Sequence, residues 1–305
     1  MRTSRTLLAL TAAVGVLAVV AAGAGVFLGG GVGPFAFTNV HGDPVEMYGV
    51  GIYDHDSLMR GSGQRGVDAV TLFLVVPLMA ASAWLHRRGS LRGTLVLAGT
   101  LLWFTYAGIS YVAAVAYNEL FLVYVALFGT SFYAVLLAFA AVDRDDLAHR
   151  IGPGAPRRAP AAFLFAIGTF TLGIWLMTPL DGLLRGQPPS DLDSYTSMFT
   201  NGFDIAVIVP ATIVVGALML RRDPLGYALG VPLVLFAGLL APMVAAMTVY
   251  QVRAGVDFTT GEVVGPISGF MVLAAVAVWL VVVLLRHVGE TTSGPTPLRP
   301  RTLVR

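Results

Sequence analysis

Eight apolar stretches, each about as long as a bilayer crossing, limit this chain to a membrane fold. They cover residues 7–28, 67–85, 94–116, 120–142, 161–180, 205–220, 225–249 and 263–285. A helix needs about 20 apolar residues to cross the hydrocarbon, and it satisfies its own backbone groups there. No stretch alternates with the period of two that a membrane β-barrel requires. The sequence therefore predicts an all-α, polytopic bundle of eight transmembrane helices.

The composition agrees with a membrane protein and excludes several chemistries. Charged residues make up 12% of the chain, against about 25% in soluble domains. There is no Cys for a disulfide or a thiolate site. All 19 basic residues are Arg, which excludes a lysine Schiff base. No His lies inside a predicted span, and no nucleotide-binding or hydrolase motif stands in its expected context, so we expect no cofactor and do not favour an enzyme.

The arginines predict the orientation of the bundle. When successive loops are assigned to opposite sides, one side holds fifteen arginines and five acids, a net charge of +10. The other side holds four arginines and twelve acids, a net charge of −8. The positive-inside rule places the first side, with both termini, in the cytoplasm of a bacterium whose plasma membrane holds the protein. Arginines there would attract anionic lipid head groups, and we expect no nucleic acid partner.

The first apolar stretch could be a secretory signal or a retained helix. Arg2 and Arg5 precede it, and the small residues at 21–25 could be cleaved. Its core of residues 7–28 exceeds the usual length of a signal, which favours a retained helix. Ala21, Gly25 and Gly29 recur at every fourth position within it, a spacing that predicts a seam where two helix backbones approach closely.

An internal repeat links the two halves of the chain. Residues 65–68 (Arg-Gly-Val-Asp) and 201–204 (Asn-Gly-Phe-Asp) each open an apolar run that ends in an Arg pair, with offsets of 133 to 136 residues. The repeat predicts two parallel four-helix halves, residues 1–150 with an outer loop at 29–66 and residues 161–288. A cytoplasmic linker at 151–160 joins them, and a disordered tail follows at 289–305. The interface between parallel repeats is the default place for a ligand.

Several motifs resemble those of a family of uncharacterised bacterial multi-pass membrane proteins. They are Arg-Gly-Val-Asp-Ala-Val-Thr-Leu at 65–72, Arg-Arg-Gly-Ser-Leu-Arg-Gly at 87–93, Tyr-Asn-Glu-Leu-Phe-Leu-Val-Tyr-Val-Ala-Leu-Phe at 117–128 and Arg-Arg-Asp-Pro-Leu-Gly-Tyr-Ala-Leu at 221–229. The resemblance covers more than half of the chain. It implies a membrane bundle, and it brings no activity, cofactor or catalytic residue with it.

Asp68 and Asp204 are the leading candidates for a ligand-binding or proton-binding site. They occupy matching places in the two repeats and could approach each other at the central axis, where burial and like charge would perturb both carboxylates. The alternative is structural. Each Asp stands where its predicted helix begins, so it could cap free backbone N–H groups, and we favour this reading. Arg65 could pair with Asp68, whereas Asn201 at the matching place could not pair with Asp204.

The outer loop and the tyrosines supply weaker candidates. A loop of this length indicates a folded cap or a mobile lid. Four of its side chains could bind a divalent metal, although their spacing matches no specific ligand signature and an acidic solvated loop explains them equally well: His41, Asp54, His55 and Asp56. Tyr117 and Tyr250 are typical of the interfacial aromatic belt. Tyr106 lies near mid-membrane, where packing is the favoured role and a pore lining the alternative.

The functional prediction depends mainly on the repeat. We expect a small-solute or ion carrier that uses a cavity at the repeat interface and is coupled to protons through Asp68 and Asp204. The alternative is a structural, sensory or assembly-partner membrane protein whose outer loop is its working surface. Repeats also build scaffolds and enzymes, so the fold alone does not decide between these classes.

Overall fold

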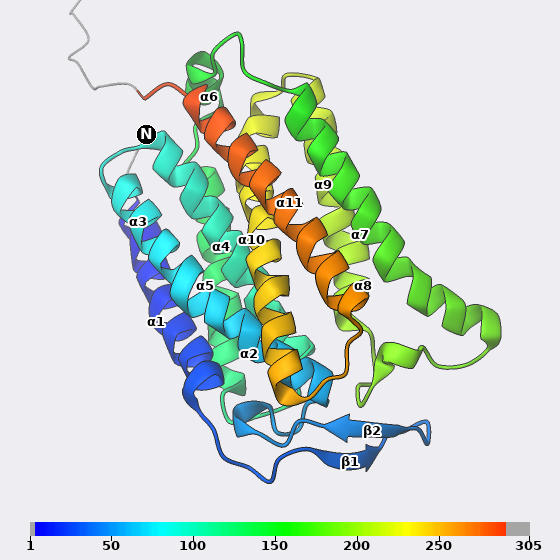
Figure 1. Cartoon of the computed structure of the whole chain (residues 1–305). Coiled ribbons are helices and arrows are strands. Elements are labelled where there is room, and N and C mark those ends of the chain that lie inside the picture. Colours follow the sequence, from blue (N-terminus) through cyan, green and yellow to red (C-terminus); the bar gives the residue numbers. More distant parts are fainter. Residues whose placement is uncertain (1–3, 291–305) are drawn as a thin grey trace, which may run out of the picture.

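The computed structural model describes residues 4–290 and contains eight helices long and apolar enough to cross a membrane (Figure 1). Six are single helices: α1 (Arg5–Phe27), α4 (Leu91–Ala113), α5 (Phe121–Ala140), α7 (Arg158–Arg185), α10 (Pro224–Ala254) and α11 (Thr260–Arg286). Two contain a π-helical turn: α2 (Leu58–Val70), η2 (Thr71–Val75) and α3 (Val76–Arg87) form one span, and α8 (Phe199–Phe203), η4 (Asp204–Ile208) and α9 (Val209–Leu220) form another. The predicted multi-pass helical bundle is confirmed.

Two spans begin six or more residues earlier than predicted, because polar residues find partners inside the fold. The second span begins at Leu58 and not at residue 67, since the Ser57 side chain accepts a hydrogen bond from the backbone N–H of Arg60 and caps the helix. The sixth span begins at Phe199 and not at residue 205. In the second span, Arg65 donates to the carbonyl of Val26 at 2.7 Å, so a charge that resembled a helix boundary lies within the helix.

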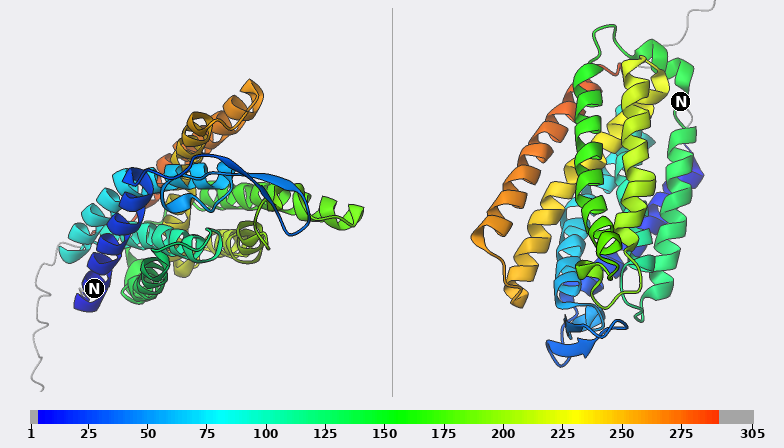
Figure 2. Two further views of the ribbon diagram at one scale, coloured as in Figure 1. Left: turned by 90° about the horizontal axis from the view of Figure 1, so that it is seen from below. Right: turned by 90° about the vertical axis from the view of Figure 1, so that its right-hand side faces the viewer.

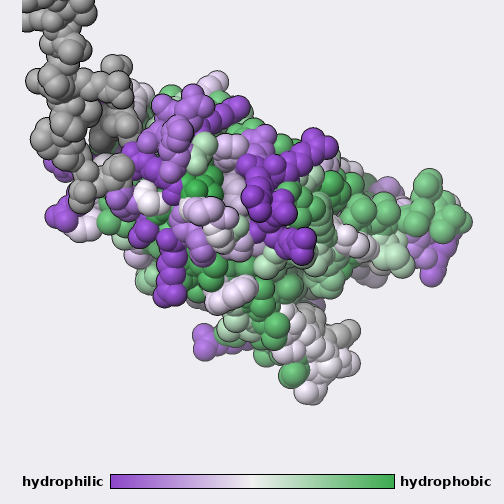
Figure 3. Space-filling view, turned by 90° about the horizontal axis from the view of Figure 1, so that it is seen from above, coloured by the Kyte–Doolittle hydropathy of each residue, from purple (hydrophilic) through white to green (hydrophobic). Residues whose placement is uncertain are grey.

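One end of the bundle collects most of the arginines, and we call it the arginine-rich end. It holds Arg87, Arg88, Arg92, Arg144, Arg150, Arg157, Arg158, Arg221, Arg222 and Arg286. Figure 3 shows hydrophilic residues gathered on this face, and α1 begins and α11 ends there (Figure 1). A short helix, α6 (Arg144–Arg150), lies in the connection after α5. The membrane side that this end faces remains a prediction, and the tail at 291–305 lies outside the described residues.

The C-terminal end of α11 is fastened to the rest of the arginine-rich end. The Glu290 carboxylate accepts hydrogen bonds from the Ser90 hydroxyl at 2.6 Å and from the backbone N–H groups of Leu91 and Arg92 at the start of α4. A carboxylate at a helix N-terminus is stabilised by the free N–H groups and the helix dipole. Residue 289, predicted to begin the tail, also bonds to the protein, since the Gly289 N–H donates to the carbonyl of Arg150.

The predicted outer loop is a folded cap, which we define as residues 28–57. Strands β1 (Phe35–Thr38) and β2 (Pro44–Met47) form an antiparallel hairpin in which Phe35 pairs with Met47. The short helix η1 (Gly51–Tyr53) follows. The cap lies at the opposite end of the bundle from the arginines (Figure 1), and we call this the cap end. A further short helix, η3 (Ser190–Leu192), lies in the connection after α7.

The predicted small-residue seam on α1 is present over part of its length. Ala21 and Gly25 are buried. A Cβ atom at Gly25 would overlap the carboxylate of Asp68, so α2 can approach α1 only because residue 25 has no side chain. Gly29 does not belong to the seam, since α1 ends at Phe27 and Gly29 is exposed.

Helix α10 is the centre of the bundle, and the two halves pack differently around it. It contacts α2, α4, α9 and α11. In the first half α1 packs along α5, whereas α7 and α11 make only a small contact in the second half. Viewed from the cap end, the ends of α7 and α11 point away from each other (Figure 2). The second half is therefore open on one side, and the 4+4 parallel repeat stays a prediction.

Candidate functional site

Asp68 lies at the centre of a buried hydrogen-bond cluster in the first half. Its side chain has no solvent exposure. The Tyr53 hydroxyl donates to Oδ2 at 2.7 Å, and the Tyr111 hydroxyl donates to Oδ1 at 2.5 Å. Ser57 is the N-cap of α2 and lies eleven residues before Asp68, which is in the last turn of that helix. The capping interpretation of Asp68 is therefore wrong, because the helix starts earlier than its apolar run.

Asp204 is buried in the second half and is also not a helix cap. Its own backbone N–H donates to the carbonyls of Thr200 and Asn201, so the helix is already formed before it. Trp175 Nε1 donates to Oδ2 at 2.8 Å, and the Tyr106 hydroxyl donates to the same oxygen at 3.4 Å. The other oxygen, Oδ1, is buried and has no hydrogen-bond partner. With 7% of its surface exposed, Asp204 leaves half of its carboxylate unsatisfied within a span.

The π-helical turns show that Asp68 and Asp204 do not match structurally. Both turns are followed by a Val-Pro pair, at Val76 and Val209, and the residue that opens the first turn is Thr71. Asp204 opens the second turn, so its counterpart is Thr71. A tryptophan donates to the opening residue of each turn: Trp103 Nε1 on α4 donates to the Thr71 hydroxyl at 3.1 Å, and Trp175 Nε1 on α7 donates to Asp204. The two donors come from helices that do not match in the two halves, and only the second turn opens with a carboxylate.

The predicted pairing of Arg65 with Asp68 is not formed. Arg65 donates to the carbonyl of Val26 and, at 3.2 Å, to the hydroxyl of Tyr48, which ties α2 to the cap. Asn201 donates to the carbonyl of Trp175 at 3.3 Å and ties α8 to α7. Asp68 and Asp204 share none of their hydrogen-bond partners, so they do not act as one carboxylate pair in this arrangement.

Of the three candidate tyrosines, only Tyr106 reaches a carboxylate. Tyr117 is 77% exposed after the end of α4, where its ring packs on Phe121. Tyr250 is half-buried on α10 near the cap end. Tyr106 sits on α4, and its ring lies 5.3 Å from that of Phe236 on α10, centroid to centroid. Tyr106, in the first half of the chain, therefore contacts Asp204 in the second half.

Two adjoining cavities lie between Asp204 and the cap end. The Asp204 cavity, about 300 Å³, lies between α4, α7, α10 and α11, and its wall is apolar apart from Asp204 and a few hydroxyl and indole groups. The second cavity, about 130 Å³, lies between α2, α4, α8 and α10 and reaches Asp56 and Arg60; we call it the cap-end cavity. Four residues line both cavities: Tyr106, Thr200, Met243 and Met247.

A cluster around Asp56 closes the cap end over these cavities. Asp56 Oδ1 accepts hydrogen bonds from the Ala116 N–H at 2.8 Å and from the Tyr195 hydroxyl at 2.5 Å. The Arg60 guanidinium lies 4.8 Å above the Tyr195 ring and 3.8 Å from Asp193 Oδ2, which also accepts from the hydroxyl of Ser57. These contacts join the cap, the end of α4 and the connection after η3 into one latch.

The weak metal candidates are not brought together. Asp56 is engaged in the latch, His55 and His41 are exposed, and the nearest approach of His55 to Asp54 is 3.9 Å. Among residues 4–290, no group of three or more acidic or histidine side chains is arranged to hold a metal ion.

Asp56 should make the stability of the protein depend on pH. Burial raises the pKa of Asp56 to about 6, although the hydrogen bonds from Tyr195 and Ala116 and the charge of Arg60 oppose the rise. The folded state therefore binds a proton that the unfolded state releases, and stability grows as the pH falls through 6. Between pH 7 and pH 5 we expect the free energy of unfolding of the wild type to increase by about 1 kcal/mol more than that of Asp56→Asn. Equal pH slopes for the two proteins, measured by denaturant titration, would contradict this assignment.

Among the described residues, two carboxylates have a buried oxygen without a hydrogen-bond partner: Oδ2 of Asp56 in the latch and Oδ1 of Asp204. Of the two, Asp204 lies within a span, in a cavity that both halves line. No protein-family model, curated protein or solved structure matches the chain. The resemblance to uncharacterised bacterial membrane proteins thus remains a prediction, and the function has to be argued from the site itself.

Proposed function

We propose that this protein is a proton-coupled carrier of a small solute or ion, and that Asp204 binds the proton or the cargo cation. One observation carries the proposal. Asp204 Oδ1 is buried, has no hydrogen-bond partner and belongs to a cavity formed between the two halves of the chain. Ionisable groups within spans are costly, and in membrane proteins they mark ion and proton pathways.

The lack of a fixed positive charge near Asp204 supports an exchange mechanism. Among the described residues, no Arg or His lies within 4.0 Å of its carboxylate oxygens. An ionised carboxylate within a span has an unfavourable free energy, and binding either a proton or a cation reduces that free-energy penalty. Because the proton and the cation would compete for the same oxygens, loading one releases the other. That competition is the simplest basis for coupling.

Access to Asp204 differs between the two ends of the bundle. Toward the cap end, the Asp204 cavity adjoins the cap-end cavity. Toward the arginine-rich end the helices are tightly packed: a Cβ atom at Gly216 of α9 would lie 2.8 Å from the Phe165 ring of α7, and one at Gly226 of α10 would lie 2.6 Å from the backbone of Met219. This difference supports a conformation in which the Asp204 cavity is accessible from the cap end and closed toward the arginine-rich end. Alternating access would require α7, α9 and α10 to separate at the other end.

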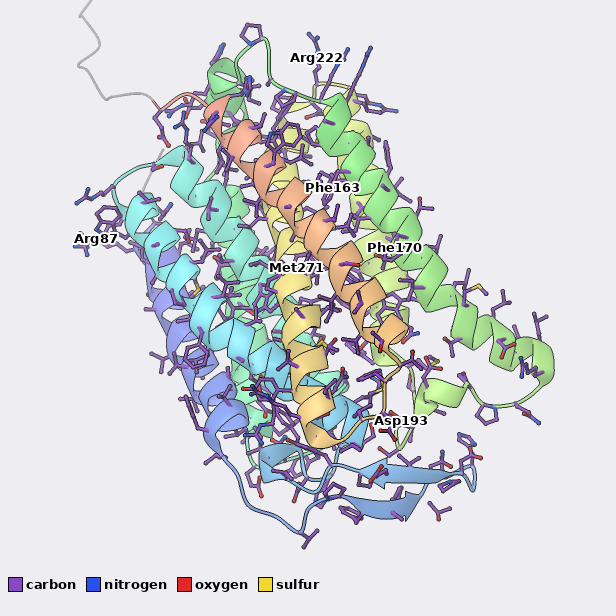
Figure 4. The ribbon with its side chains drawn as sticks, in the orientation of Figure 1. Arg87, Phe163, Phe170, Asp193, Arg222 and Met271 are labelled. Carbon is purple, nitrogen blue, oxygen red and sulfur yellow. The ribbon has the colours of Figure 1, made fainter. Side chains whose placement is uncertain are left out.

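The arginine-rich end supports an orientation with this end in the bacterial cytoplasm, following the positive-inside rule. Its exposed guanidinium groups, which include Arg87 and Arg222 (Figure 4), would then face anionic lipid head groups. In that orientation, the cap and the latch lie outside the cell. Cargo would then reach Asp204 from the periplasm or the outer leaflet.

Proton exchange in liposomes tests the proposal. The purified protein is reconstituted with a trapped pH indicator and an acidic lumen, and sodium, potassium, tetramethylammonium or benzyltrimethylammonium chloride is added outside. We expect at least one cation to drive proton efflux above the rate of protein-free liposomes, and Asp204→Asn to abolish that excess. Asp181→Asn, which removes an exposed acid paired with Arg185 on α7, is the matched control and should keep the wild-type rate. Efflux that is unchanged in Asp204→Asn would refute the role of this carboxylate.

A further inference from the structure

We propose that the Asp204 cavity binds one amphipathic cation, a single positive charge on a compact apolar body, which enters sideways from the membrane between α7 and α11. This inference names the cargo class of the carrier and, to that extent, rests on the proposed function. Binding itself requires no transport, so the two claims can fail separately.

The charge and the wall of the cavity define the ligand. Among the side chains that the structure describes, Asp204 is the only acidic or basic one that lines this cavity, and Oδ1 is the oxygen left free to receive a cation. The remaining wall is mostly aliphatic and aromatic, with residues such as Ile167, Leu240 and Val244. An inorganic ion would lose its hydration here and regain one charged oxygen and at most a few hydroxyl groups. A cation with an apolar body would be stabilised by the ion pair with Asp204 and also by the burial of its apolar surface against the wall.

Aromatic rings surround the position of the charge. Trp175 and Tyr106 both donate to Oδ2, which fixes the carboxylate and leaves Oδ1 directed away from them. The ring of Phe236 packs on Tyr106, and both belong to the wall. A desolvated cation is attracted to the negative face of an aromatic ring. Quaternary ammonium groups suit such a site because they present charge without needing hydrogen-bond acceptors.

The size of the cavity argues for a small molecule. At about 300 Å³, it lies at the lower end of the range of ligand pockets. That volume accommodates one ring with a cationic substituent and excludes a whole phospholipid. The cargo class is therefore a small organic cation and not a membrane lipid.

An apolar crevice leads from the side of the bundle to the cavity. It has a volume of about 870 Å³ and lies between α7 and α11, lined on the α11 side by Gly265, Ser268 and Gly269. Four residues belong to both the crevice and the cavity: Ile167, Phe170, Ile174 and Phe270. Phe170 of α7 and Phe270 of α11 meet edge to face, with 6.1 Å between their ring centroids.

The crevice faces the region that lipid would occupy. Phe170 is 48% exposed and Ile174 is 44% exposed on a helix whose outer end diverges from α11 (Figure 2). A Cβ atom at Gly269 would meet no atom within 4 Å. Small residues on α11 therefore leave a gap beside the aromatic pair. Rotation of Phe170 or Phe270 would widen this gap for an entering ring.

Equilibrium binding of radiolabelled benzyltrimethylammonium to the full-length protein in phosphatidylcholine nanodiscs tests the charge assignment. Empty nanodiscs provide the background. We expect saturable binding that is weakened at least tenfold in Asp204→Asn and unchanged in Asp181→Asn. Unlabelled tetramethylammonium, which has the charge without the ring, should compete at least tenfold more weakly than unlabelled benzyltrimethylammonium.

A second pair of variants tests the route through the membrane. Gly269→Phe fills the crevice without touching Asp204, and we expect it to slow association at least fivefold. Gly129→Phe places the same bulk in open space on α5, in the other half, and should bind at the wild-type rate. Equal association rates for both variants would overturn the lateral route.

The outcomes separate this inference from the carrier proposal. If benzyltrimethylammonium binds through Asp204 but no cation drives proton exchange in liposomes, the binding site is supported and the carrier proposal is refuted. If sodium or potassium drives exchange while benzyltrimethylammonium fails to bind, or binds equally in Asp204→Asn, the cargo class proposed here is overturned. Tetramethylammonium binding as tightly as its benzyl relative would also overturn it.

Discussion

Replacing Gly66 by alanine should lower the free energy of unfolding by about 3 kcal/mol, because α2 and α10 touch backbone to backbone at this residue. A Cβ atom there would lie 2.5 Å from the carbonyl carbon of Ala246 and 2.6 Å from the Cα of Met247. Neither neighbour is a flexible side chain, so the two helices would have to move apart along the contact that joins the two halves. The measurement is unfolding of the purified protein in mixed micelles with increasing denaturing detergent.

A second Gly-x-Asp segment in the chain supplies the control for this experiment. It begins at Gly202 on α8, where a Cβ atom would meet nothing within 4 Å. Gly202→Ala should leave stability unchanged or raise it by about 0.5 to 1 kcal/mol through helix propensity. Similar losses in both variants would show that the close approach of α2 and α10 is not what Gly66 provides.

Asp68→Ala should lower the free energy of unfolding by about 3 to 5 kcal/mol, since it removes the acceptor of two buried hydroxyl groups. Each orphaned hydroxyl, on Tyr53 and on Tyr111, costs about 1 to 3 kcal/mol, and the missing side chain leaves a cavity. Asp68→Asn keeps one carbonyl acceptor and should recover part of the loss. Adding Tyr53→Phe and Tyr111→Phe to the alanine variant should recover part of it too, because no donor then remains unsatisfied.

The relation between Asp68 and Asp204 can be measured in the same way. Their hydrogen-bond partners are separate, so the losses caused by Asp68→Ala and Asp204→Ala should add. A strongly non-additive double variant would mean that the two carboxylates are coupled. In that case, the assignment of Asp68 to structure and Asp204 to the cavity would be wrong.

Sequence reasoning predicted the spans well because lipid imposes a strong and simple requirement on them. Eight apolar runs became eight helices, and the long loop before residue 58 became a folded cap. Errors concentrated at the helix ends. Arg65 interrupts the apolar run, yet it belongs to α2, because Tyr48 of the cap supplies a hydrogen-bond partner that no hydropathy pattern reveals.

The role of the two aspartates could not be predicted from spacing alone. Their distance of 136 residues suggested equivalence, but the Val-Pro pairs at 76–77 and 209–210 are 133 residues apart and set the structural register. Pro has no N–H to continue the α-helical pattern, and in both spans the π-helical turn comes just before it. Aligning the prolines would have paired Asp204 with Thr71.

Two kinds of site residue were missed. Trp175, Tyr53 and Tyr111 donate to the carboxylates from elements far away in the sequence. A Trp or Tyr in a span also resembles ordinary packing, so its hydrogen bond becomes visible only when the helices are assembled. The lateral crevice was missed for the same reason, because it depends on the angle between α7 and α11 and not on any motif.

Accessibility of the cavity to water and cations is the central claim, and the absence of Cys makes it directly measurable. Thr200→Cys places one thiol where the two cavities meet, and Thr100→Cys places one in the fully buried part of α4. Thr196→Cys, in the exposed connection before α8, reports full accessibility. A water-soluble cationic methanethiosulfonate should modify Thr200→Cys readily, more slowly when Asp204→Asn is added, and leave Thr100→Cys intact. If Thr200→Cys resists the reagent while Thr196→Cys reacts, no open path leads to Asp204 and the account is wrong.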